Sequence, residues 1–482
     1  MPEASDHSDS VQPAPAPAPG VERGRKRRIV AGWCVLGLCM AAFAAWQLRP
    51  QGPLPIETLP GVLRIPAEDW VEFAFLNPPE GVGWVALPGE RQGRRSDSRA
   101  PEPGPGWLEP SACVDCHREI VESYFETAHA RTMTLPSRDT ILGALTPPDN
   151  RLPTAVEGLE FEMFERDGEF LVGLDVRRGR RTYRADVPIA FVVGSGNHGQ
   201  SYLHWADGML CQLPVSYFSE FDRWTNNPGI ARDGTADFAR PVTDRCLDCH
   251  STWFSHIPRT VNRYVRSGWI LGVTCVRCHG PADRHVAHHR SHPEDSTGRD
   301  IINPAALSRD RANEACAQCH SGAGELLQPA FTYVPGDPLQ SHLDIDLTGE
   351  GEQNDDPHSA NQLGRLMRSR CYQESDDLRC TTCHDPHHHE RGQRESFSAR
   401  CANCHAVDDC GARARLGSGI DGRCVECHMP SRRDAEVTAQ DSEGDLLPLL
   451  RDHLIGKWPE ASERIEADIL ANPSATPPSP SP

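Results

Sequence analysis

The stretch Cys275-Val276-Arg277-Cys278-His279 is one of seven places where the chain has the pattern Cys-x-x-Cys-His. Two cysteines three residues apart lie on one face of a helix, and the histidine follows directly. This spacing suits covalent attachment of haem c, because both thiols can form thioethers with the haem vinyl groups and the histidine becomes the proximal iron ligand. In chain order, motifs 1 to 7 are Cys113, Cys116, His117; Cys246, Cys249, His250; Cys275, Cys278, His279; Cys316, Cys319, His320; Cys380, Cys383, His384; Cys401, Cys404, His405; and Cys424, Cys427, His428.

Zinc binding and disulfide formation compete with haem attachment for these cysteines. Zinc sites and disulfide frameworks both use cysteine pairs, but neither requires a histidine directly after each pair. Every Cys-x-x-Cys in this chain is followed by histidine. The sequence therefore predicts seven covalently bound haem c groups, with a zinc or disulfide scaffold as the open alternative. Cys371 and Cys410 remain as candidates for one disulfide.

The number of histidines predicts a second axial ligand for most of the irons. The chain has 22 histidines, far more than the seven in the motifs. Haems with two axial histidines are suited to electron transfer. His256 is the candidate distal ligand for the seventh haem. The predicted distal ligands are His129, His198, His285, His358, His387 and His453.

Composition sets the wider limits. A length of 482 residues suggests about three domains. The net charge of −19 argues against broad binding of nucleic acid. The 40 glycines and 42 prolines predict many loops. Between Cys246 and Pro430 the strand signal is weak, so the fold is expected to be mainly α, with short helices and irregular loops. Seven haems in this length of chain must lie close together, so the domain is expected to be organised around stacked haems.

The N-terminal part predicts membrane attachment. Residues 29–48 are apolar apart from Gln47 and would span about 30 Å as a helix, which is one bilayer core. A basic cluster precedes this run, so the tail 1–28 is expected to be disordered and cytoplasmic. A cleaved signal peptide is the alternative for the same run. We expect one transmembrane helix in the bacterial inner membrane, with the bulk of the protein in the periplasm.

The remaining chain divides by composition and pattern. Residues 49–106 form a Pro/Gly-rich linker, residues 107–456 the heptahaem domain, and residues 457–482 a C-terminal tail. A small β-rich insertion is expected at about 156–220. Asp167-Gly168 and Asp207-Gly208 predict two hairpins inside it.

The chain resembles a large bacterial family of multihaem c-type cytochromes, related to the tetrahaem acceptor cytochrome of ammonia oxidisers and to hydroxylamine oxidoreductase. Stretches that carry the resemblance include Ala128–Met133, Gly194–Leu203, Cys278–Pro281, Cys383–His387 and Asp452–Ile455. The resemblance covers about residues 107–456 and implies a haem-packed, mostly α fold. It also supports the distal ligands given above. The chain departs from many relatives in having no long tetratricopeptide array. It also departs from the related pentahaem nitrite reductase pattern in having no Cys-x-x-Cys-Lys motif.

Two functions remain open from the sequence. The first is electron relay between redox partner proteins, such as a quinol oxidase and a periplasmic acceptor, with no catalytic residue. The second is an oxidoreductase that acts on a small nitrogen or sulfur species at one five-coordinate haem. An electron carrier is favoured over an enzyme because bis-histidine haems leave no open iron.

Overall fold

The structure is a computed structural model of the chain. It describes residues 54–55, 57–59, 62–64, 107–154, 156–206, 208–228, 236–322, 324–345, 347, 361–433 and 438–472. The predicted tail 1–28, the apolar run 29–48 and His358 lie outside the described residues. Within the described ranges, no helix combines the length and apolar character that a membrane span requires.

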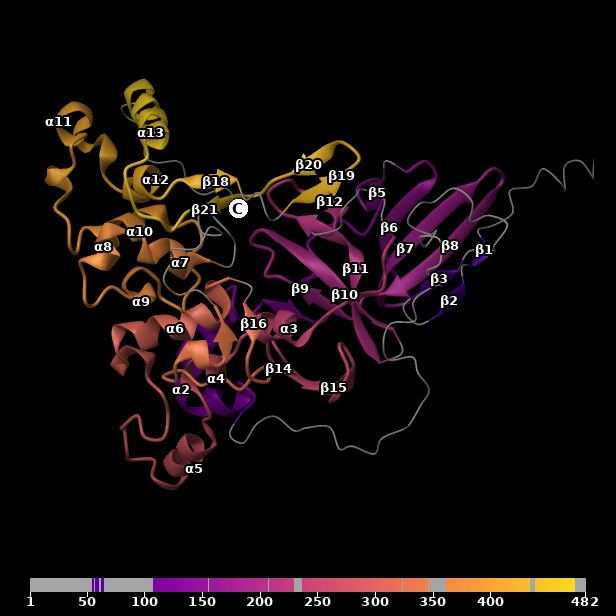
Figure 1. Cartoon of the computed structure of the whole chain (residues 1–482), viewed down its shortest axis with the longest axis horizontal. Helices are drawn as coiled ribbons and strands as arrows, with labels where there is room; N and C mark the ends of the chain where they lie inside the picture. The colour runs from indigo at the N-terminus through magenta and orange to yellow at the C-terminus, as the bar shows by residue number, and fades with distance from the viewer. Residues whose placement is uncertain are drawn as a thin grey trace, which may run out of the picture. The chain divides into compact units, whose positions relative to one another are not determined.

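The fold is mixed, so the prediction of a mainly α protein is wrong (Figure 1). A five-stranded and an eight-stranded sheet are present together with many short helices. The strands also extend beyond the predicted insertion at 156–220, from β1 (Leu54–Pro55) to β21 (Leu449–Arg451), and include β4 (Met133–Thr134). Sheet structure is therefore a major part of this protein.

The five-stranded sheet has the order β1-β8-β7-β6-β5. Its hairpin β6–β7 confirms the prediction from Asp167-Gly168, because both residues have positive φ, as a tight hairpin turn requires. Along β6, buried and half-buried side chains alternate, so one face of the sheet points to a core. The strands are β1 (Leu54–Pro55), β5 (Arg151–Pro153), β6 (Leu159–Arg166), β7 (Glu169–Arg178) and β8 (Arg181–Pro188).

The eight-stranded sheet contains the second predicted hairpin, β10–β11, in which Ala206 pairs with Met209. Its order is β20-β19-β12-β11-β10-β9-β4, with β13 paired to β11. The strands are β9 (Phe191–Val193), β10 (Gly199–Ala206), β11 (Met209–Phe218), β12 (Arg223–Asn226), β13 (Arg240–Pro241), β19 (Ala439–Asp441) and β20 (Gly444–Leu446), besides β4.

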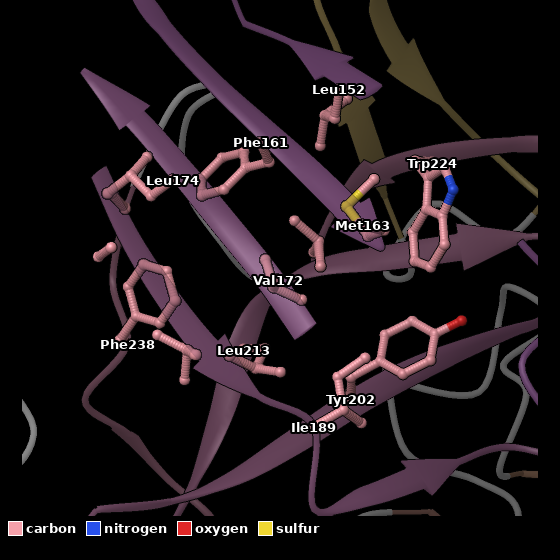
Figure 2. Packing of buried hydrophobic residues seen from close by; sticks show 14 of the residues in the cluster. Leu152, Phe161, Met163, Val172, Leu174, Ile189, Tyr202, Leu213, Trp224 and Phe238 are labelled. Atoms are coloured by element: carbon pink, nitrogen blue, oxygen red, sulfur yellow. The ribbon is translucent and has the colours of Figure 1, made fainter. Parts of the chain in front are cut away.

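Apolar side chains from both sheets form one continuous core (Figure 2). Phe161 and Met163 from β6 are fully buried, and Tyr202 and Leu213 from the other sheet are as well. Trp224 closes the core and donates from its indole nitrogen to the Ala144 carbonyl at 3.1 Å. We call this two-sheet unit the β-sandwich; it contains none of the seven motifs.

The strands between motifs 2 and 3 do not follow from the sequence pattern. β14 (Ser251–His256) and β15 (Tyr264–Leu271) pair, but the register shifts twice along the pair. Such irregularities interrupt the two-residue alternation that signals a strand. Other two-stranded sheets pair short strands: β2 (Glu57–Leu59) with β3 (Val62–Arg64), β16 (Glu325–Leu326) with β17 (Leu343–Asp344), and β18 (Ser431–Arg433) with β21.

The helices are short and carry the motifs. They are α2 (Ser111–Phe125), α3 (Asp244–His250), α4 (Cys275–His279), α5 (Asp283–Ser291), α6 (Arg309–His320), α7 (Gln362–Met367), α8 (Arg370–Gln373), α9 (Cys380–Cys383), α10 (Arg394–Cys401), α11 (Arg413–Leu416), α12 (Cys424–His428) and α13 (Pro459–Ala471). Short 3₁₀ turns lie at Pro304–Ala306, Leu339–Ser341, Val407–Asp409 and Gly417–Ile420. The segment expected as a C-terminal tail thus contains α13, which buries Ala461 and Ile469.

Candidate haem-binding sites

The motifs occupy helix ends. α3, α4, α6 and α12 each end on the histidine of a motif, and α9 ends one residue before His384. In α2 the backbone leaves helical geometry at His117, with φ −121° and ψ 36°. Each of these motifs therefore forms about one turn of helix that presents two thiols and then turns the histidine away.

The motif side chains remain accessible. All 14 motif cysteines and all seven motif histidines lie in the described ranges, and none of them is buried. None of these cysteines forms a disulfide, and Cys371 and Cys410 are free as well. Among the described residues, no group of three or more His, Cys, Asp or Glu side chains is arranged to hold a metal ion.

Thiols of different motifs approach one another. The side chains of Cys113 and Cys275 are neighbours, and so are those of Cys249 and Cys319, of Cys316 and Cys380, and of Cys401 and Cys424. These contacts join motif 1 to 3, motif 2 to 4, motif 4 to 5, and motif 6 to 7.

Two further contacts identify the remaining neighbouring motifs. Nε2 of Gln318 in motif 4 donates to the Arg277 carbonyl in motif 3 at 3.2 Å, which places motif 3 beside motif 4. Arg400, directly before motif 6, donates from Nη1 to the Cys383 carbonyl of motif 5, which places motif 6 beside motif 5. The motifs therefore lie in the spatial order 1–3–4–5–6–7, with motif 2 beside both motif 3 and motif 4.

Four motif histidines each face a second histidine. Ring centroids are 6.3 Å apart for His117 and His285, and 6.1 Å apart for His320 and His129. The other two pairs are His279 with His387 at 6.1 Å and His384 with His453 at 6.2 Å. In each pair, one member belongs to a motif and the other is a predicted distal ligand.

The separations match an imidazole–metal–imidazole sandwich. A metal lies about 2 Å from the imidazole nitrogen that binds it, so two rings with a metal between them have centroids roughly 6 Å apart. Histidines that simply touch are closer: His285 and His289 are 4.5 Å apart, and His288 and His292 are 4.6 Å apart. The residues present therefore fit a haem iron between the rings of each of the four pairs.

One ring of every pair is oriented by a hydrogen bond from its Nδ1 atom. Nδ1 of His279 lies 2.8 Å from the Ile302 carbonyl, and Nδ1 of His285 lies 2.7 Å from the Arg299 carbonyl. A carbonyl can only accept, so Nδ1 carries the proton and Nε2 keeps the lone pair that binds a metal. His320 and His453 are held in the same way, by the Gln362 side chain at 2.9 Å and the Arg451 carbonyl at 3.1 Å.

The protein environment keeps several of these rings neutral. Burial lowers the pKa of His453 to about 4. Desolvation by neighbouring protein atoms also lowers the pKa of His129 to about 4, although this residue is exposed. Desolvation likewise lowers the pKa values of His320 and His384. Neutral imidazole is the form that binds iron.

A buried ion pair holds the segment that carries His453. Asp452 is fully buried and accepts from Nε and Nη2 of Arg365 at 2.9 and 2.6 Å. Arg432 adds a further bond at 3.0 Å. The sequence resemblance drew attention to Asp452 beside His453, but no local pattern points to Arg365, which lies 87 residues away.

The other motif histidines and predicted ligands are placed differently. Nδ1 of His428 donates to the Gly456 carbonyl at 2.8 Å, which leaves its Nε2 available as in the four pairs. His405 and His198 are exposed, and the ring of His250 is only partly accessible. His256 is the candidate ligand for the seventh haem. Its Nδ1 forms an ion pair with Asp244 at 2.9 Å, and its Nε2 lies 3.2 Å from the Thr260 hydroxyl. Both of its ring nitrogens are therefore already occupied.

The chain shows partial similarity to known cytochromes. Residues 219–280 match the family model described as cytochrome c554 and c-prime. This match includes motifs 2 and 3, and it supports a c-type cytochrome with covalently bound haem c. No curated protein matches the chain. A solved structure, the outer cell wall cytochrome OcwA, aligns with a TM-score of 0.47 and 15% identity over 77% of this chain and 84% of that one. Similarity at this level carries no argument about function.

Proposed function

We propose that this protein is an extracytoplasmic electron-transfer cytochrome that binds seven haem c groups and relays electrons along them. The observation that carries the proposal is the set of four histidine pairs, each with the spacing of an axial ligand pair. Haem iron between two histidines exchanges electrons without exchanging ligands. The polypeptide contributes the ligands, their orientation and the surrounding charge.

The order of the motifs supports a relay. Because neighbouring motifs bring their cysteines into contact, haems attached to them would lie next to each other in the order 1–3–4–5–6–7. Motif 2 would form a branch where motifs 3 and 4 meet. A path of this form has two ends, near α2 and near α12, and a third opening at motif 2. Redox partner proteins would exchange electrons at these places.

The distal histidines also connect the motifs mechanically. His285 follows motif 3 but faces motif 1, and His387 follows motif 5 but faces motif 3. His129 follows motif 1 but faces motif 4. Iron bound between such pairs would cross-link segments that are far apart in sequence, so haem binding and folding are coupled in this region.

A matched pair of variants tests the relay. His387 faces His279, whereas the adjacent His388 is 62% exposed and bonds to Asp385 at 2.9 Å. His387→Ala should convert one low-spin haem to a high-spin haem in the EPR spectrum of the oxidised holoprotein. His388→Ala should leave the spectrum unchanged. The intact mass should show seven haems in both; fewer than seven, or no high-spin signal from His387→Ala, would contradict the proposal.

An enzyme remains the second candidate because a cavity lies beside motif 2. It has a volume of about 360 Å³, and its lining includes Asp244, Arg245 and His256. Asp244 raises the pKa of His256 by hydrogen bonding, so this pair could hold a proton near the haem of motif 2. Adding nitrite to the oxidised protein, and carbon monoxide to the reduced protein, distinguishes the two functions. A spectral shift on ligand addition would favour the oxidoreductase.

A further inference from the structure

Residues between the cysteines of three motifs meet in one buried cluster. Asp248 belongs to motif 2, Arg277 to motif 3 and Gln318 to motif 4. Nη2 of Arg277 donates to the Asp248 carbonyl at 2.7 Å and to its Oδ1 at 3.2 Å. Nε2 of Gln318 donates to the Arg277 carbonyl at 3.2 Å. The three residues are 1–5% exposed, so the link between the motifs excludes water.

With Arg245 included, the buried groups around Asp248 carry more positive than negative charge. Arg245 also approaches Asp248, with Nη1 at 3.4 Å from Oδ2. Two guanidinium groups thus share one carboxylate, and arginine stays protonated in proteins. Asp248, Arg277 and Arg245, which we call the junction cluster, therefore carry one excess positive charge. Nε and Nη1 of Arg277 are buried, and no hydrogen-bond partner for them is present among the described residues.

Aromatic rings hold Arg277 in place. Its guanidinium carbon lies 5.8 Å from the centroid of Trp107 and 5.7 Å from that of Phe331. Cation–π contacts of this kind stabilise a desolvated cation. The charge therefore has a fixed position at the junction of the three motifs.

The charge reaches motifs 2 and 4. Nη1 of Arg245 lies 3.1 Å from Sγ of Cys249. Nη1 of the same arginine donates to the Gln318 carbonyl at 3.1 Å, directly before Cys319 of motif 4. These two cysteines are the attachment points of the haems at motifs 2 and 4.

We propose that the junction cluster raises the reduction potentials of the haems at motifs 2 and 4, and so makes the branch point the place where electrons collect. Reduction adds one negative charge, and a fixed positive charge in a low-dielectric interior stabilises it. The step is the transfer of one electron, in which one iron is oxidised while another is reduced and no bond forms or breaks. This inference rests on the proposed function, because it requires haem at both motifs.

Two variants with opposite expected signs test the proposal in the haem-loaded full chain. Arg277→Gln removes the positive charge and keeps a hydrogen-bond donor. This variant should lower the equilibrium constant for reduction of the haem at motif 2 or motif 4 about tenfold, which is about 59 mV for a one-electron couple. Asp248→Asn removes the negative charge and should shift the same haem in the opposite direction. Spectroelectrochemical titration followed by EPR measures both.

A third variant and a control complete the experiment. Arg245→Gln should lower the potential in the same direction as Arg277→Gln, and its side chain lies nearer the surface at 15% exposure. Arg370→Gln is the control, because Arg370 pairs with Glu374 on an exposed helix where its side chain is 86% exposed. It should shift no haem potential.

The outcomes separate this proposal from the relay itself. Intact mass and haem content are measured first, and fewer than seven haems in the unmutated chain would contradict the proposed function. Full haem content with equal potentials in all variants would overturn the junction proposal alone. Shifts in the same direction for Arg277→Gln and Asp248→Asn, or loss of haem from all three junction variants, would show a structural role and would also overturn it.

Discussion

The β-sandwich and the motif-bearing helices are held together by different means. Twenty buried apolar residues form one cluster in the sandwich, and Phe161, Met163 and Val172 are fully buried there. Around motif 4, the corresponding cluster contains five buried residues, and the motif cysteines and histidines of the whole helical part remain accessible. Burial of apolar surface can stabilise the first region. The second has paired histidines and thiols where the first has apolar side chains, as expected if the proposed haems complete its core.

Removing one haem should produce the largest difference in hydrogen-exchange protection between the two regions. Cys316→Ser with Cys319→Ser deletes attachment at motif 4, the centre of the motif order. We expect the helices around motifs 1 to 5 to lose protection from hydrogen exchange, because metal-dependent sites lose their folding energy with the metal. The β-sandwich should keep its protection. Equal protection of the helices with and without this haem would contradict the comparison.

A substitution inside the sandwich should have the reverse pattern. Phe161→Ala leaves a cavity in a fully buried position and should lower the free energy of unfolding of this region by about 3–5 kcal/mol. The haem spectrum should stay unchanged. Leu470→Ala, at a side chain that is 62% exposed, is the control and should cost less than about 0.5 kcal/mol. Denaturant unfolding monitored by tryptophan fluorescence and by haem absorbance measures each region separately.

The buried ion pair beside His453 should affect both stability and spectrum. Asp452→Ala leaves Arg365 buried without its carboxylate and should cost about 3 kcal/mol. It should also release His453 and give a partial high-spin signal from the haem of motif 5. Arg370→Ala, in an exposed pair, should change neither quantity. A stability loss with a fully low-spin spectrum would show that the ion pair does not position His453.

The smallest expected effect is the pH dependence of the His256–Asp244 pair. Hydrogen bonding to Asp244 raises the pKa of His256 above its usual value of 6.5, so protonated His256 favours the folded state. The stabilisation is fully present below pH 6.5 and disappears as the pH rises through the folded-state pKa. Its size should be less than about 1 kcal/mol.

The pair can be isolated by comparing variants. The stability difference between the unmutated chain and His256→Gln should fall as the pH rises from about 5 to about 9. A difference that is constant over this range, or that grows with pH, would show that the ion pair does not contribute in this direction. Far-UV circular dichroism during thermal unfolding provides the measurement.

Part of this protein could be predicted directly from the sequence. The motifs identify covalent haem attachment because both thiols and the proximal histidine lie within five residues of each other. The turn at Asp167-Gly168 likewise identifies a hairpin, because its geometry depends on two adjacent residues. The resemblance to multihaem cytochromes also drew attention to His129 and His387. In contrast, the mainly α fold was predicted wrongly, because sheets assemble from distant segments: β12 pairs with β19, more than 200 residues away.

The sequence by itself determined which residues at each motif are spaced for haem attachment, because that spacing is local. The tertiary structure decided which histidine faces which motif, in what order the motifs lie, and where charge is buried. His453 meets His384 of a motif far earlier in the chain, and Arg277 meets Asp248 from another motif. Such contacts result from how the whole chain packs. No local pattern contains them, because the free energy that selects them comes from burial and from pairing between distant segments.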